Sequence, residues 1–306
     1  MSITDAPWRT RRLRWPLEAG LVQAWLALAR RMPVQRASDM GARVGRAIGP
    51  RIPYSRRAHQ NMRLALPEAD AAARRRILDE MWTRLGRLVA EYPHLSRLGD
   101  PGAGYVTCEG LERLDDVRAG RRAAIVVTTH FSGFEVLNVL LSRLVGETLF
   151  IVRAPNNPHV VAPLDAARRI GGGTTSRKGV QGARDATRTL KRNGLVLMLP
   201  DQRMSEGVEA SFFGHAAGTP PGPAQLALRH NVPLLPVRMR RTGSVGFHMT
   251  VEPPLSVPDP GDPAAHRLAL TEAMNRRFEA WIRETPEEWL WLHRRWPKAL
   301  YATLPA

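Results

Sequence analysis

A histidine and a carboxylate stand five residues apart where a predicted strand is followed by a predicted helix. Residues Ala123 to Thr129 form a short, uncharged, β-branched run typical of a buried strand, and apolar residues recur at helical spacing from Val136 to Leu144. His130 follows the strand and Glu135 falls in the first turn of the helix, where α/β folds collect catalytic groups. We predict that His130 is a general base and that Glu135 holds its second ring N–H and stabilises the imidazolium.

A plainer interpretation fits the same two residues. His130 would then be an ordinary strand-end histidine, and Glu135 a carboxylate favoured by the helix dipole. Gly133, which lies between them, is expected to let the chain turn tightly.

Other predicted strands are also followed by charged residues. Arg153 comes after a strand from Thr148 to Val152, and Asp201 comes after one from Leu195 to Leu199. A buried carboxylate without a cationic partner is strongly destabilising, so Asp201 needs one. The candidate partners are Arg153, Arg169 and Lys178. A pair between Asp201 and Arg169 would either shape the floor of a binding site or serve the fold alone.

Two glycine-rich loops are further candidates for binding. Gly171 to Gly173 precede Thr174 to Lys178, but their spacing matches neither the Walker loop nor the dinucleotide fingerprint, so nucleotide binding is rejected. Arg177 and Lys178 could still meet the phosphates of a lipid or of a carrier arm. Ser211 to Gly214, followed by Gly218 to Gly222, are expected to wall an apolar pocket. The nine histidines show no metal-binding pair, so we expect no metal.

Strands and helices alternate after residue 99. Strands are predicted at Val106 to Cys108, Ala123 to Thr129, Thr148 to Val152, Leu195 to Leu199, Pro233 to Met239 and Gly246 to Glu252. Helices are predicted at Val136 to Leu144, His159 to Ile170, Val180 to Arg192, Pro223 to His230 and His266 to Glu284. This order predicts an α/β fold with a largely parallel central sheet covered by helices. We divide the chain into an N-terminal helical region, residues 1–98, and an α/β core, residues 99–306.

The N-terminal region carries features of a membrane-associating helix. Leu17 to Met32 has one apolar helical stripe, but its longest uncharged run is eleven residues, short of the ~20 that a bilayer crossing needs. The stripe consists of Leu17, Leu21, Trp25, Leu28 and Met32. An arginine run between Trp8 and Trp15 precedes it and further arginines follow, which suits a helix lying in a membrane interface. A helix packed on the protein core is the alternative, and no cleaved signal peptide is expected.

Composition narrows the possible partners. The 306 residues include 43% hydrophobic ones, enough for a sizeable core, and the net charge of +17 favours anionic partners. Only three of the 45 cations are lysines, so part of the arginine excess reflects a bias in composition. Cys108 is the single cysteine; it excludes an internal disulfide and is expected to pack in a strand without acting as a nucleophile.

An ordered set of these motifs resembles the bacterial lipid A biosynthesis late acyltransferases. The set comprises His130-x4-Glu135, Arg153-Ala-Pro-Asn-Asn-Pro, a helix ending at Arg169, Asp201-Gln202, Phe212-Phe213-Gly214 with Gly218-Thr219-Pro220, Pro233 to Val237, and PEEWLWLHRRW from Pro286 to Trp296. These lauroyl and myristoyl transferases belong to the lysophospholipid acyltransferase superfamily. The family commonly shows Gly-Asn-Trp-Glu where this chain has Ser132-Gly133-Phe134-Glu135, and its N-terminal anchor is shortened here.

The resemblance implies an activity and its partners. A fatty acyl group would pass from an acyl carrier protein thioester to a hydroxyl of a lipid A precursor, at the cytoplasmic face of the inner membrane and without a cofactor. His130 matches the family's catalytic histidine and Glu135 its acidic partner, and the substrate-binding candidates are Arg153, Arg169, Lys178 and Asp201. The positive charge then suits the carrier protein, a phosphorylated lipid and an anionic membrane surface, and no nucleic-acid-binding motif accompanies it.

Two other functions are compatible with the same residues. The acceptor could be a lysophospholipid, an ornithine-type lipid or a glycolipid. Alternatively, the chain could be a membrane-associated lipid-binding protein without activity, against which the intact pair of His130 and Glu135 argues.

Overall fold

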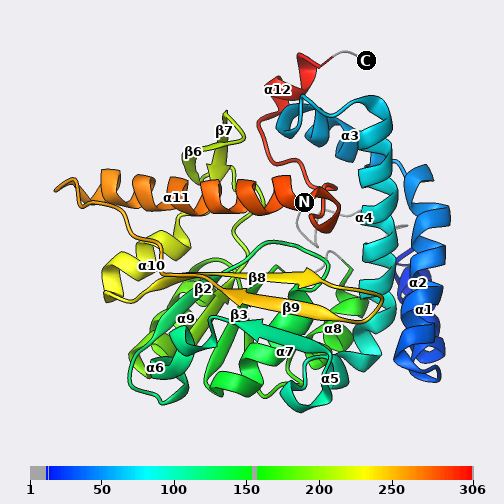
Figure 1. Ribbon diagram of the computed structural model, residues 1–306, viewed down its shortest axis with the longest axis horizontal. Helices are drawn as coiled ribbons and strands as arrows, with labels where there is room; N and C mark the ends of the chain where they lie inside the picture. Colours follow the sequence, from blue (N-terminus) through cyan, green and yellow to red (C-terminus); the bar gives the residue numbers. More distant parts are fainter. Residues whose placement is uncertain (1–11, 13, 154–156, 305–306) are drawn as a thin grey trace.

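The fold is organised around a mostly parallel sheet (Figure 1). The computed structural model describes residues 12, 14–153 and 157–304. The seven-stranded sheet has the order β1-β9-β8-β2-β5-β3-β4, and β8 with β9 is its antiparallel pair. Its strands are β1 (Val106–Glu109), β2 (Ala124–Val127), β3 (Thr148–Val152), β4 (Thr174–Arg177), β5 (Leu195–Met198), β8 (Leu234–Arg241) and β9 (Phe247–Val251). A separate hairpin pairs β6 (Val208–Phe212) with β7 (His215–Thr219).

Helices cover both faces of the sheet, and alternate residues of each strand fill two cores. On β2, Ile125 and Val127 join the core beneath α9, α10 and α11, whereas Ala124 and Val126 face the core beneath α5, α6 and α7. A strand buried on both faces explains the unbroken apolar runs in the sequence. These helices are α5 (Leu95–Leu98), α6 (Asp115–Arg118), α7 (Phe134–Val145), α8 (Val161–Arg168), α9 (Val180–Lys191), α10 (Gly222–His230) and α11 (Pro263–Glu284).

The N-terminal helices stand beside the sheet, with the long α4 between the core and the outer helices α1 and α2 (Figure 1). They are α1 (Trp15–Arg30), α2 (Val34–Ile48), α3 (Tyr54–Ala65) and α4 (Ala71–Glu91). Gly41 of α2 and Gly86 of α4 lie so close that a Cβ on either would overlap the carbonyl oxygen of the other. Among the described residues, no helix is both long and apolar enough to cross a membrane.

The C-terminal segment returns to the centre of the molecule after α11. A short 3-10 turn, η8 (Pro286–Glu288), packs against α4, and the chain then runs on to α12 (Lys298–Ala302). Trp289, Trp291 and Trp296 are buried there, as is Arg295, whose guanidinium donates to Thr219 and lies over the ring of Phe212. Burial lowers the pKa of Arg295 to about 10.

The predicted α/β architecture is confirmed, with specific exceptions. The sequence missed β4, β6 and β7, which contain many small or polar residues and lack the β-branched runs of the central strands. Phe212 and Phe213 are buried in the core, and the expected apolar pocket at this loop stays a prediction. Cys108 lies exposed on β1. The division of the chain at residue 98 stays a prediction.

Candidate active site

The carboxyl edge of the parallel strands gathers the predicted site residues. Strands β2 and β5 are neighbours, so His130 and Asp201, which follow them, leave the sheet side by side. Arg153 follows β3 and Lys178 follows β4, at the same edge. The order of the strands therefore assembles groups that are far apart in the sequence, as is usual at this edge of an α/β fold.

His130 is held by Asp201. The Nδ1 atom of His130 lies 2.7 Å from Oδ1 of Asp201, and Oδ2 accepts the backbone N–H of His130 at 2.9 Å. The Asp201 side chain is 1% exposed, and Trp289 Nε1–H donates to Oδ2 at 2.8 Å. Burial favours the neutral acid, but His130 and these hydrogen bonds outweigh it and lower the pKa of Asp201. Asp201 is therefore an ionised acceptor that keeps the ring proton on Nδ1.

The opposite ring nitrogen of His130 is available for proton transfer. With a proton on Nδ1, the neutral ring carries its lone pair on Nε2, and the side chain is 20% exposed. The amide nitrogen of Gln202 lies 3.2 Å from Nε2 and can donate to it. The rings of Phe134 and His293 lie 5.3 Å and 6.3 Å away, centroid to centroid. A hydroxyl that displaces Gln202 would meet the free lone pair.

Glu135 does not contact His130, contrary to the sequence prediction. Its side chain is 0% exposed, and it binds Arg168 through Nη2 at 2.7 Å and Nε at 3.0 Å. Tyr92 also donates its hydroxyl to this carboxylate. Successive helical residues point about 100° apart. Phe134 faces the His130 ring, so Glu135 points toward α8 and the 3-10 turn η4 (Tyr92–His94), which follows α4.

Arg168 and Tyr92 engage both oxygens of the Glu135 carboxylate, while Nη1 of Arg168 is buried without a hydrogen-bond partner among the described residues. Burial and the Glu135 carboxylate raise the pKa of Tyr92 well above its usual value. Burial alone would lower the pKa of Arg168, but Glu135 outweighs it, so that pKa is raised. The cluster is a buried ion pair and phenol that join α7, α8 and η4.

The predicted pairing of Asp201 with Arg153, Arg169 or Lys178 is also wrong. Asp201 binds His130 and Trp289, while Arg169 is exposed and has no ion pair among the described residues. Its neighbour Arg168 forms the buried ion pair with Glu135, because at the end of α8 the Arg168 side chain points into the protein and the Arg169 side chain points to solvent.

Arg153 and Lys178 remain as unpaired cations within the described part of the chain. Both are exposed, at the ends of the adjacent strands β3 and β4. Partial burial, together with the positive charge of Arg153, lowers the pKa of Lys178. The Glu206 carboxylate opposes this shift with a smaller effect. Neither cation has an ion pair among the described residues, so the two are suited to an anionic ligand.

The loop after His130 is shaped by close packing. Gly133 lies in the turn before α7, as expected, but its φ of −99° is open to any residue. A Cβ at this position would instead lie 2.5 Å from the Met239 side chain.

Three site residues were in recognised motifs but received no role from the sequence. Gln202 and Trp289 contact the His130–Asp201 pair directly. Burial, followed by repulsion from His130, lowers the pKa of His293 to about 4, so this ring is neutral at pH 7. The density of aromatic and charged residues from Pro286 to Trp296 was the available signal.

A small hollow of about 20 Å³ opens at His130. Most of its lining is apolar and comes from α4, the start of α7 and the C-terminal segment: Met81, Leu85, Leu88, Phe131, Phe134 and Leu290. A larger hollow of about 480 Å³ lies between the end of α10, the start of β8 and α11, and none of the polar site residues lines it. The chemistry therefore belongs to the smaller hollow.

An imidazole held by a buried carboxylate at the carboxyl edge of a mostly parallel sheet is an arrangement found at the active sites of α/β enzymes, and its geometry can support proton transfer. The chain matches the bacterial lipid A biosynthesis acyltransferases over residues 7–298, and it belongs to that family. Membership identifies it as an acyltransferase and supports transfer to a lipid acceptor.

Named relatives differ in the lipid that they modify. The lipid A biosynthesis palmitoleoyltransferase of Escherichia coli K12 is 25% identical over 294 residues, which cover 92% of this chain and 90% of that protein. The lipid A biosynthesis lauroyltransferase of the same organism is 28% identical over 248 residues, which cover 78% of this chain and 77% of that protein. A phosphatidylinositol mannoside acyltransferase of Mycolicibacterium smegmatis is 34% identical over 111 residues, which cover 36% of this chain and 34% of that protein.

Proposed function

We propose that this protein transfers a fatty acyl group from an acyl carrier protein thioester to a hydroxyl of a lipid A precursor, with His130 as general base. The observation that carries the proposal is the buried Asp201 carboxylate on Nδ1 of His130, because it leaves Nε2 as the proton acceptor. This replaces Glu135 with Asp201 as the partner of the base. No cofactor is invoked, since a thioester is already activated.

The reaction balances with this pair alone. Nε2 of His130 takes the proton as the acceptor oxygen attacks the thioester carbonyl carbon. The tetrahedral intermediate then collapses with loss of the carrier thiolate, which receives the proton from the imidazolium. The products are the ester and the free carrier thiol, and Asp201 stabilises the imidazolium throughout. General-base help of this kind contributes about 10² to 10⁴ in rate.

Substrate recognition follows from the surroundings of His130. Arg153 and Lys178 are cations at the same sheet edge and suit an acceptor phosphate. Val180, at the start of α9, is 72% exposed, and Met204, after β5, is 38% exposed. These exposed apolar residues suit a ligand with a charged head and hydrocarbon chains. The hollow at His130 has room for about one water-sized group, so an acyl chain that reaches His130 has to displace the apolar side chains that line it.

We also propose that α1 lies on an anionic membrane surface, at the cytoplasmic face of the inner membrane. Leu17, Leu21 and Leu28 are 66%, 65% and 48% exposed and share one face of α1, while Trp15, Ala19 and Ala29 are buried against the protein. Of the predicted stripe, Trp25 and Met32 are half-buried. Of the arginine run, Arg9 and Arg11 lie outside the described residues, whereas Arg12 and Arg14 are exposed. Exposed Arg30 and Arg31 follow the stripe, as interfacial binding requires.

Acyl transfer by the purified protein tests the central proposal. Labelled acyl carrier protein and a lipid A precursor are mixed with wild type or His130→Ala, and the product lipid is identified by mass spectrometry. We expect an acylated product with wild type and a loss of about 10² to 10⁴ in kcat with the variant, measured at a temperature at which it is folded. Equal turnover by the two proteins would refute the assignment of the base.

A glycolipid acceptor is the second candidate. The local identity to a phosphatidylinositol mannoside acyltransferase is higher than the identity to the longer-matching lipid A enzymes, though it spans about a third of the chain. Mass spectrometry of lipids from cells with and without the gene distinguishes the acceptors, because the lipid that loses one acyl chain is the substrate.

A further inference from the structure

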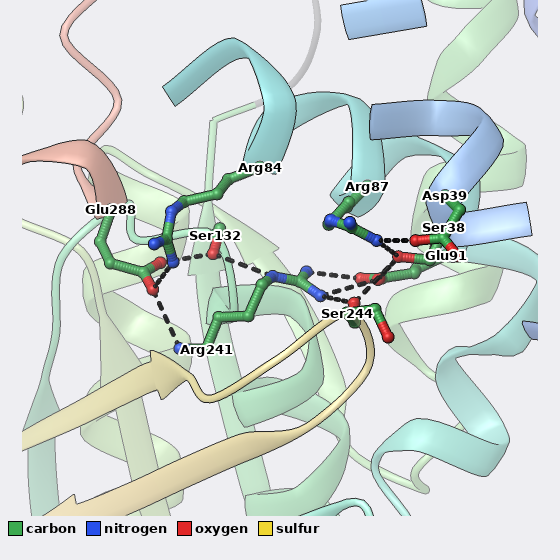
Figure 2. A network of polar contacts seen from close by, with 9 residues as sticks. All are labelled: Ser38, Asp39, Arg84, Arg87, Glu91, Ser132, Arg241, Ser244 and Glu288. Carbon is green, nitrogen blue, oxygen red and sulfur yellow. Dashed lines mark hydrogen bonds and ion pairs between the residues drawn. The ribbon is translucent and has the colours of Figure 1, made fainter. Parts of the chain in front are cut away.

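Two buried carboxylates anchor a polar network beside the site, at the carboxyl end of β8 (Figure 2). The Glu91 and Glu288 side chains are 0% and 1% exposed. Each carboxylate accepts hydrogen bonds from one arginine and one serine hydroxyl. The donors to Glu91 are Arg241 and Ser38, and the donors to Glu288 are Arg84 and Ser132. The two halves meet at Arg241, whose backbone N–H donates to Glu288 at 3.0 Å and whose guanidinium binds Glu91.

The Glu288 half gathers segments from four parts of the chain. Arg84 comes from α4, Ser132 from the loop after His130, Arg241 from the end of β8, and Glu288 from η8 (Figure 2). Such a buried carboxylate is stable only while its donors are in place, because an unpaired charge there is strongly disfavoured. The position of η8 is therefore set by all three of the other segments.

The residues that follow Glu288 touch both members of the catalytic pair. Trp289 Nε1–H donates to Asp201 at 2.8 Å, and the backbone N–H of Leu290 donates to the carbonyl oxygen of His130 at 3.1 Å. Phe131 and Trp289 also form an isolated antiparallel bridge. Glu288 thus fixes two segments that contact the pair. Its carboxylate holds Ser132, two residues after His130, and its backbone leads directly into Trp289 and Leu290.

We infer that Glu288 is a positioning residue for the His130–Asp201 pair. It acts through Ser132, Trp289 and Leu290, and it does not contact the reacting atoms. The inference rests on the proposed role of His130. A displacement of about 1 Å in a catalytic group costs about 10²-fold in rate, so a loosened η8 lowers kcat without altering substrate affinity.

Glu91 supplies the matched control. It is as buried as Glu288 and has the same two kinds of partner, Arg241 at 2.7 Å and Ser38 at 2.7 Å. Its partners connect α4, α2 and the turn between β8 and β9. Arg241 also reaches the Glu288 half, through its backbone N–H and through Nε, which lies 3.4 Å from Ser132 Oγ, but neither Glu91 nor Ser38 contacts the segment from Trp289 to Leu290. A purely structural network predicts equal effects from the two carboxylates.

The experiment compares Glu288→Gln with Glu91→Gln in the full-length protein. We expect both to lower the melting temperature, while kcat of the folded protein falls by about 10²-fold in Glu288→Gln only, with the KM values for donor and acceptor unchanged. Equal kcat in the two folded variants, or losses of kcat that follow their melting temperatures, would overturn the inference.

A spectroscopic readout keeps the test independent of turnover. The protein is labelled with ¹⁵N-histidine, and the His130 signals among the nine histidines are assigned by their loss in His130→Gln. Wild type and Glu91→Gln should show a single tautomer with the proton on Nδ1, and Glu288→Gln a mixture. Ser132→Ala, which removes one hydroxyl, replaces Glu288→Gln if that variant does not fold. An absence of acyl transfer by wild type would refute the proposed function, while a single tautomer in the Glu288 or Ser132 variant would refute the positioning role.

Discussion

Two single variants, Asp201→Asn and Glu135→Gln, distinguish the roles of two buried carboxylates that have different surroundings. Asp201 uses both oxygens to accept N–H groups from His130 and Trp289. Asparagine keeps one acceptor and introduces an NH₂ group, which pairs with Nδ1 only when the ring proton has moved to Nε2. The base then lacks its lone pair at the reacting position. A comparable substitution in the serine protease triad lowers kcat by about 10⁴, so we expect Asp201→Asn to lower kcat by about 10² to 10⁴.

Glu135→Gln should act on stability. Glu135 is 0% exposed and Arg168 is 11% exposed, so the substitution leaves a buried cation without its counter-ion. Breaking a buried ion pair costs about 3 to 5 kcal/mol, which corresponds to a fall in melting temperature of roughly 6 to 10 °C for a chain of this size. The kcat of the folded protein should stay near that of wild type, because the carboxylate does not contact His130.

Steady-state kinetics and thermal melts of the same preparations check both expectations. Assays run well below the lower melting temperature compare only folded protein, and Arg168→Met, which removes the other member of the ion pair, is the control for Glu135→Gln. A variant Glu135→Gln that is folded yet inactive, with Asp201→Asn fully active, would refute the assignment of partners and restore the sequence prediction.

Three further predictions concern other parts of the chain. Because burial and repulsion from His130 place the folded-state pKa of His293 near 4, against 6.5 for the free side chain, the unfolded state binds the extra proton between these values. The free energy of unfolding should therefore fall by roughly 3 kcal/mol as pH drops from 6.5 to 4. Urea denaturation should show that this free energy depends less on pH in His293→Asn than in wild type. Leu21→Glu should weaken sedimentation with anionic vesicles, and binding by wild type should decrease as salt rises; unchanged binding by the variant would count against the α1 surface. Gly86→Ala should destabilise the protein by about 1 to 3 kcal/mol or more, because its Cβ meets the backbone of α2, and a melt equal to wild type would contradict that packing.

The sequence by itself determined the architecture and the edge at which the site lies. Uncharged, β-branched runs such as Ala123 to Thr129 predict strands buried on both faces, and their alternation with helices predicts a parallel sheet. Parallel strands end at one edge, so the positions of His130, Arg153 and Asp201 after three of them were enough to predict that they gather there. Polar β4 and the hairpin of β6 and β7 escaped prediction because their pairing depends on neighbours and not on local composition.

Only the tertiary structure decided which charges pair. The adjacency of β2 and β5 brings Asp201 to His130, and this strand order is a long-range property that local spacing does not contain. Glu135 lies closer to His130 in sequence, yet one step of helical rotation directs it to Arg168. The C-terminal segment reaches the pair from more than 80 residues away in the chain, where Glu288 is held by its buried partners and Trp289 meets Asp201. Contacts of this kind arise from packing in three dimensions, and a pattern of residue types along the chain leaves several of them equally possible.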